Sequence, residues 1–242
     1  MHFRKTSTGE DWISLSDVMT GLMLVFLLIA VAFMRQERLK ADEIRVQKKA
    51  IEEIAVEFRD RQDSLYAELA STFGDSLNSW NARVTRPDTL SVIFESPEVL
   101  FEAGKATLRP RFKEILQVFW PRFVEVLRKD GFRDHIDEIR IEGHTSSEWI
   151  GKDYWSAYFK NMELSQKRTR AVLRYVLSHG ANREGLLWQQ SLVTANGLSS
   201  SKPIKLPDKT EDVAASRRVE FRVRTSATRQ VRKIINELLI QP

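Results

Sequence analysis

The chain has 242 residues, a formal net charge of +5 and no cysteine. This length fits one membrane segment and one domain of ordinary size, and a hydrophobic content of 42% is enough for a packed core. The absence of cysteine excludes disulfide bridges, thiolate metal sites and a thiol nucleophile. The positive charge favours anionic surroundings such as lipid headgroups or an anionic polymer. Because the charge is spread along the whole chain, nucleic acid is not an expected partner.

Residues 12–34 form an apolar segment that predicts a transmembrane helix. Its 23 residues would span about 34 Å as a helix, which exceeds a hydrocarbon core of about 30 Å. Trp12 suits one membrane interface, and Arg35 and Arg38 close the other end. The sequence RQERLKADE follows without a small-residue cleavage site, so an anchor that is not cleaved is expected rather than a signal peptide. Residues 1–11 are then a short tail.

Asp17 stands at the head of the uncharged run from Val18 to Met34. Inserting a carboxylate near the centre of a membrane helix costs about 2.5–3.5 kcal/mol, and less near an end. A residue that is unfavourable in lipid indicates a function, here the binding and release of ions. The alternative is that Asp17 merely caps or begins the helix at the membrane surface, together with Ser14 and Ser16. Spacing alone leaves both interpretations open.

The residues around Asp17 carry a family resemblance. Trp12, Asp17, Met19 and Thr20, in the pattern W-x4-D-x-M-T, resemble the start of the transmembrane helix of MotB-type stator subunits. The pattern is similar, more loosely, to the ExbD/TolR transducers. The resemblance implies that Asp17 takes up a proton, or accompanies Na+, and passes it inward.

Residues 35–85 read as a charged helical connector. Four apolar residues recur at steps of seven, which favours a two-stranded coiled coil. The repeat consists of Ile44, Ile51, Phe58 and Leu65. Gln47 and Arg61 make the seam imperfect, so the alternative is a single helix packed on the next domain. A coiled-coil homodimer would bring two Asp17 carboxyls close to one axis.

The tract that follows alternates strand-like and helix-like pieces, which predicts helices layered on one face of a sheet. Pro121 predicts a kink or break in the first helix. The expected strands are 90–94, 139–142, 192–195 and 219–223, and the expected helices are 111–129, 161–179 and a C-terminal one within 227–242.

Four separated blocks in this tract resemble the OmpA C-terminal family in order and spacing. They are Phe101-x2-Gly104-x-Ala106-x-Leu108, Ile141-Glu142-Gly143-His144-Thr145, Asn161-x2-Leu164-Ser165-x2-Arg168 and Arg217-Arg218-Val219-Glu220. The resemblance covers roughly residues 90–224. It implies an α+β fold, with an OmpA-like β-α-β-α-β domain and a mixed sheet over residues 86–226. That family binds peptidoglycan non-covalently, so peptidoglycan is an expected partner.

The same resemblance implies a set of ligand-binding residues. The family holds the diaminopimelate side of the stem peptide, and a guanidinium pairs with its carboxylate through two parallel hydrogen bonds. Arg168 falls on the family's carboxylate-binding arginine, although a surface arginine on a helix is also commonly just solvated. The peptidoglycan-binding residues implied are Thr145, Ser146, Asn161, Arg168 and Arg218.

One position departs from the family. The family usually reads Gly-His-Thr-Asp, whereas this chain has the neutral Ser146 in place of the aspartate. Glu148 is the nearest candidate to supply the missing charge. The aromatic loop 147–160 also differs from the standard family. His144 has no second histidine at metal-ligand spacing, so a structural role is expected, with no metal and no cofactor.

A wall-binding domain must be periplasmic, which places the N-terminus in the cytoplasm and the chain in the bacterial inner membrane. Charge alone would suggest the reverse, but long domains translocate largely regardless of it. The stator resemblance implies a homodimer inside a ring of five multi-span A subunits of the MotA/ZorA type. Overall similarity points to the stator-like subunits of Zorya anti-phage defence.

Three other functions remain open from the sequence. They are a flagellar-type stator subunit, a passive peptidoglycan anchor without ion flux, and an energy transducer of the ExbD/TolR type. The last is disfavoured because those transducers lack a complete OmpA-like domain. An enzyme is not expected, because no set of nucleophile, base and orienting group is visible.

Overall fold

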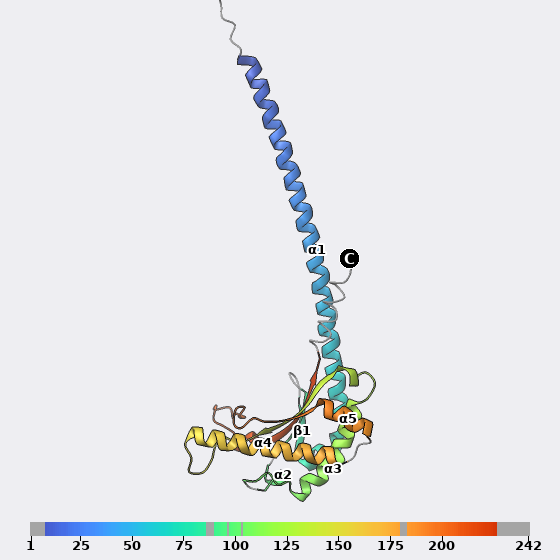
Figure 1. Cartoon of the computed structure of the whole chain (residues 1–242), viewed down its shortest axis with the longest axis vertical. Helices are drawn as coiled ribbons and strands as arrows, with labels where there is room; N and C mark the ends of the chain where they lie inside the picture. The colour runs from blue at the N-terminus through green and yellow to red at the C-terminus, as the bar shows by residue number, and fades with distance from the viewer. Residues whose placement is uncertain (1–7, 86–89, 96, 103, 180–182, 227–242) are drawn as a thin grey trace, which may run out of the picture. The chain divides into compact units, whose positions relative to one another are not determined.

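A computed structural model describes the chain except for residues 1–7, 86–89, 96, 103, 180–182 and 227–242 (Figure 1). The chain divides into two compact units, Met1–Ala55 and Val56–Pro242. The predicted C-terminal helix, 227–242, lies outside the described residues, as does most of the predicted tail, 1–11.

The first unit contains the start of helix α1 (Thr8–Leu77). In the described part of the chain, α1 is the one helix that is long and apolar enough to cross a membrane. Its most apolar stretch of 18 residues has a mean hydropathy of 2.4. Its apolar side chains are exposed on every side between Val18 and Met34. A helix that is apolar all round suits lipid rather than water, which agrees with the predicted membrane segment.

The last part of α1 belongs to the second unit and packs into its core. Leu65, Leu69 and Phe73 follow one another at helical spacing and are fully buried. Leu65 is therefore not free to join a seam with a second copy, and for this part of the connector the packed-helix alternative is correct. Ile44 and Ile51, in the first unit, are exposed. A coiled coil through the part of α1 that contains Ile44 and Ile51 stays a prediction.

The second unit is built on one five-stranded sheet with the order β1-β2-β5-β3-β4. The β3–β4 pair is parallel and the other pairs are antiparallel, so the sheet is mixed and the predicted α+β class is confirmed. The strands are β1 (Ala82–Thr85), β2 (Leu90–Phe94), β3 (Ile136–His144), β4 (Val193–Gly197) and β5 (Arg218–Thr225).

Two long helices and several short ones accompany the sheet (Figure 1). Helix α3 (Pro110–Leu127) contains Pro121 and continues past it, so the proline does not break the helix. Helix α4 begins earlier than the sequence predicts, because the Asp153 carboxylate accepts hydrogen bonds from the backbone of Trp155 and Ser156. The helices are α2 (Pro97–Leu100), α3 (Pro110–Leu127), α4 (Tyr154–Ser178), α5 (Arg183–Leu192) and α6 (Val213–Ser216), with 3₁₀ turns at Asn78–Trp80 and Arg133–His135.

The core is dominated by aromatic rings between the sheet and α3. Phe119 lies 4.9 Å from Phe221 on β5 and 5.1 Å from Phe94 on β2, measured between ring centroids. Because side chains alternate along a strand, Phe221 points into this core while its neighbours Glu220 and Arg222 point to the other face. This alternation decides which residues of β5 are able to reach a ligand.

Gly197, at the end of β4, lies against the backbone of α4. A Cβ atom added there would lie 2.3 Å from the backbone nitrogen of Gln166. Gly197→Ala is therefore expected to lower the free energy of unfolding by about 1–3 kcal/mol, measured by denaturation of the full chain. Gly74→Ala is the matched control, because that glycine is helical and has no atom within 4 Å of an added Cβ. The control should be neutral or slightly stabilising; equal stability of both variants would refute the packing argument.

Candidate functional site

A cavity of about 390 Å³ opens between the segment after α2, the loop after β3 and helix α4. Four of the five predicted binding residues line it, namely Thr145, Ser146, Asn161 and Arg168. The other lining residues are Phe101, Gly104, Glu148, Trp149, Ile150, Leu164 and Arg217.

Arg168 is a half-buried cation of this cavity. Its guanidinium carbon lies 4.8 Å from the ring centroid of Phe101, and its Nε donates a hydrogen bond of 2.9 Å to the Lys105 carbonyl. Burial, and then the charge of Arg217, lower the pKa of Arg168 to about 10, so the group remains charged at neutral pH. Arg168 is thus a positioned cation rather than a freely solvated helix charge, and it suits a carboxylate.

Arg217 and Glu148 complete the charges of the cavity. Arg217 donates from Nε to Ser146 Oγ at 3.0 Å, and its Nη2 lies 3.6 Å from Glu148 Oε2. The site therefore offers two guanidinium groups and one carboxylate. This charge pattern suits a zwitterion, with its carboxylate on the arginine side and its ammonium on Glu148. Arg217 thus contacts both Ser146 and Glu148, and the substitution of Glu148 for the family's aspartate charge stays a prediction.

Asn161 and Thr145 have different roles in the same cavity. The Asn161 side-chain amide donates to the carbonyls of Ser146 and Glu148, at 3.0 and 3.3 Å, and so holds the loop after β3. The backbone of Thr145 donates to the Ser199 carbonyl. Its buried hydroxyl has no hydrogen-bond partner among the described residues.

Arg218, the fifth predicted binding residue, does not line the cavity, so its part in binding stays a prediction. It is buried, donates from Nε to Glu220 at 2.7 Å and donates from Nη1 to the carbonyls of Lys202 and Ser216. Because β5 begins at Arg218 and successive residues point in opposite directions, the preceding Arg217 reaches the cavity instead. The doubled arginine was visible in the sequence, but its strand register was not.

Arg218 belongs to a buried charge cluster with Glu142, His144, Glu220 and Arg222. His144 Nε2 lies 3.6 Å from Glu142 and 3.4 Å from Glu220, and these three side chains are close enough to hold a metal ion. The Glu142 and Glu220 carboxylates, however, already interact with arginines. Glu220 accepts one hydrogen bond from each arginine, and Glu142 lies 3.3 Å from Arg222. The geometry therefore favours a structural ion-pair cluster.

The cluster predicts a pH dependence of stability. Burial lowers the pKa of His144 below 6.5 and outweighs the attraction of Glu142 and Glu220, so the folded chain resists protonation. As pH falls below about 6.5, the unfolded chain binds more protons than the folded one, and stability falls by up to about 1.4 kcal/mol per pH unit. His144→Gln should flatten the melting temperature between about pH 6.5 and pH 5, whereas His179→Gln, at an exposed site, should not. An unchanged slope in His144→Gln would contradict this assignment.

Asp17 is exposed and lies in the first unit, within α1. The helix begins at Thr8, so Asp17 neither caps nor starts it. A carboxylate placed inside the helix, directly before the apolar run, fits the ion-binding interpretation.

Comparisons with known proteins agree with this architecture. The OmpA family model matches residues 100–218. The Zorya protein ZorB of Escherichia coli is 43% identical over 235 residues, which cover 97% of this chain and 96% of that protein. The chain belongs to the ZorB family. Because the similarity covers nearly the whole length, it includes the apolar part of α1 as well as the OmpA-like domain.

Other known proteins are similar to this chain at lower sequence identity. The uncharacterized protein YtxE of Bacillus subtilis is 24% identical over 93% of each chain. Among solved structures, a putative MotB-like protein from Desulfovibrio vulgaris is 24% identical, covers 75% of this chain and 96% of its own, and has a TM-score of 0.49.

Proposed function

We propose that this ZorB-family chain is the B subunit of an ion-driven membrane motor in Zorya anti-phage defence. One observation carries the proposal. A single chain joins a helix with a carboxylate at the head of its apolar run to a domain whose cavity presents a half-buried arginine. Relatedness to the Zorya protein ZorB along nearly the whole chain supports the assignment to defence rather than swimming.

The domain acts as the wall anchor. Its cavity offers Arg168 and Arg217 to a carboxylate and Glu148 to an ammonium. The free end of a diaminopimelate side chain in peptidoglycan carries both charges on one carbon. Anchoring requires the domain to lie in the periplasm, which places the N-terminus in the cytoplasm and α1 across the inner membrane.

The helix supplies the ion path. Two copies of α1, surrounded by five multi-span A subunits, would bring two Asp17 carboxylates to the axis of the complex. Each elementary charge that crosses about 100 mV of membrane potential releases about 2.3 kcal/mol. Alternate loading of the two Asp17 groups, with a proton as the favoured ion, turns the A ring around a B dimer that the wall holds still.

Phage plating on cells that carry the complete operon tests the proposal. The motor predicts that both Asp17→Asn and Arg168→Gln lose protection, because it needs both the ion and the anchor. A passive anchor predicts that Asp17→Asn protects as well as the wild type while Arg168→Gln does not. That second pattern would overturn the motor.

A further inference from the structure

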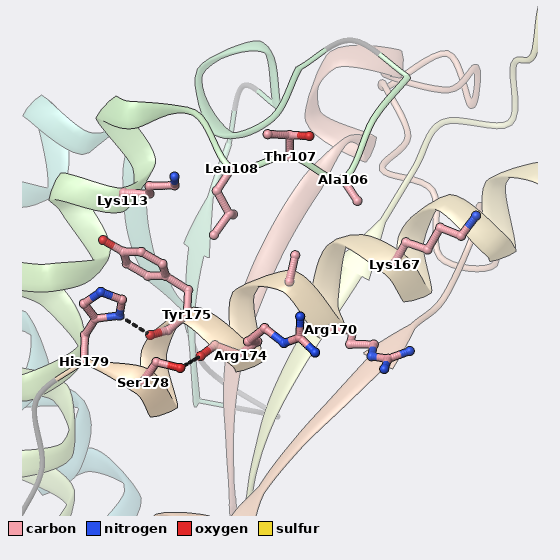
Figure 2. A pocket seen from close by; sticks show the side chains of 11 residues that line it. Ala106, Thr107, Leu108, Lys113, Lys167, Arg170, Arg174, Tyr175, Ser178 and His179 are labelled. Carbon is pink, nitrogen blue, oxygen red and sulfur yellow. Dashed lines mark hydrogen bonds between the residues drawn. The ribbon is translucent and has the colours of Figure 1, made fainter.

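A second cavity, of about 520 Å³, is lined by the segment Ala106–Leu108 and by residues of α3 and α4 (Figure 2). It shares no lining residue with the first cavity. Four basic side chains surround it: Lys113 from α3, and Lys167, Arg170 and Arg174 from α4. No acidic residue is among the described residues that line it.

The positive charge of this cavity is not neutralised within the described part of the chain. Lys113, Arg170 and Arg174 are exposed, and the structure gives none of them an ion pair with a described residue. Lys167 is the exception, because its Nζ lies 2.6 Å from Glu163. Many other surface cations of the chain are paired within one helical turn or loop, such as Lys105 with Glu102 and Arg111 with Glu114.

One wall of the cavity is apolar and ordered. Leu108 is buried, and the half-buried ring of Tyr175 stacks on His179 with centroids 4.3 Å apart. The Nδ1 of His179 donates to the Tyr175 carbonyl at 2.8 Å, which fixes the imidazole (Figure 2). Cations over an apolar wall suit a ligand with an anionic head and a less polar body.

We infer that this second cavity binds a phosphate-bearing ligand. A carboxylate carries one charge and is satisfied by a single guanidinium fork. A phosphate ester carries up to two charges and at least three acceptor oxygens, which matches two arginines and two lysines from two helices. This inference does not depend on peptidoglycan binding or on Asp17.

Equilibrium dialysis of the detergent-purified full chain against radiolabelled pyrophosphate at low salt tests the inference. Saturable binding is expected, and the double variant Arg170→Gln, Arg174→Gln should weaken it at least about tenfold. Lys160→Gln is the matched control, because Lys160 is exposed on the same helix and lines neither cavity. The control should bind within about twofold of the wild type.

Three competitors identify the ligand class. Orthophosphate is a free phosphate, and glycerophosphoglycerol is the headgroup of an anionic lipid. Both should displace pyrophosphate. The stronger competitor identifies whether the natural ligand is a free phosphate or a lipid headgroup. Acetate, a carboxylate with a single charge, should compete less well than either. Binding that does not saturate, equal binding by the double variant with an unchanged melting temperature, or acetate as the best competitor would each overturn the inference.

Discussion

Replacing Asp17 with asparagine is expected to abolish anti-phage protection to the level of a deletion strain. Asparagine has nearly the same size as aspartate but cannot take up and release a proton at this position. Asp17→Glu keeps a carboxyl group and should retain part of the activity. Ser16→Ala, which removes the neighbouring polar group, is the matched control and should protect fully. Full protection by Asp17→Asn would exclude Asp17 as the ion carrier.

Loss of function in Asp17→Asn should not come from failed assembly. A carboxylate in a membrane helix is unfavourable by up to about 3.5 kcal/mol, so its neutral replacement should insert at least as well. Copurification of the variant with the multi-span A subunit is therefore expected at the wild-type level. Reduced copurification would point to a structural role for Asp17 instead.

The second large effect is expected at Arg168. Arg168→Gln should weaken binding of the full chain to purified sacculi about 10- to 100-fold, because a hydrogen-bonded charge pair contributes about 1.5–3 kcal/mol. Arg168→Lys keeps the charge but loses the planar fork, so it should bind at an intermediate level. The readout is the fraction of protein that sediments with sacculi.

Two controls separate ligand contact from folding at Arg168. Lys160→Gln removes a charge from the same helix outside the cavity and should sediment like the wild type. Because Arg168 also stacks on Phe101 and bonds the Lys105 carbonyl, the melting temperature of Arg168→Gln must be measured in parallel. Unchanged sedimentation by a folded Arg168→Gln would remove the arginine from the site.

The sequence predicted the central strands and the long helices because their patterns are strong. The alternation of apolar and charged residues in β3 and β5 reflects a sheet with two different faces. Strand β1 and helix α5 were missed, since β1 has only four residues and is half-exposed along most of its length. The end of α1 was read as connector because its apolar spacing fits a dimer seam and a domain core equally well.

Part of the candidate binding site could likewise be predicted from the sequence, and part could not. Motif order alone located Thr145, Ser146, Asn161 and Arg168, which come together in one cavity. The choice between the adjacent arginines of β5 depends on where the strand begins, and a one-residue change in register exchanges the two faces. Sequence spacing could not supply that register, so it did not single out Arg217 as a residue that lines the cavity.

The most direct test of the motor is ion flux through the complex of this chain and the A subunit in proteoliposomes under an imposed membrane potential. Uptake should depend on pH rather than Na+ in the wild type and should fall to background in Asp17→Asn. Arg168→Gln should retain its flux in this wall-free system. Equal flux in the wild type and Asp17→Asn, or none in either despite correct assembly, would contradict an ion-carrying Asp17.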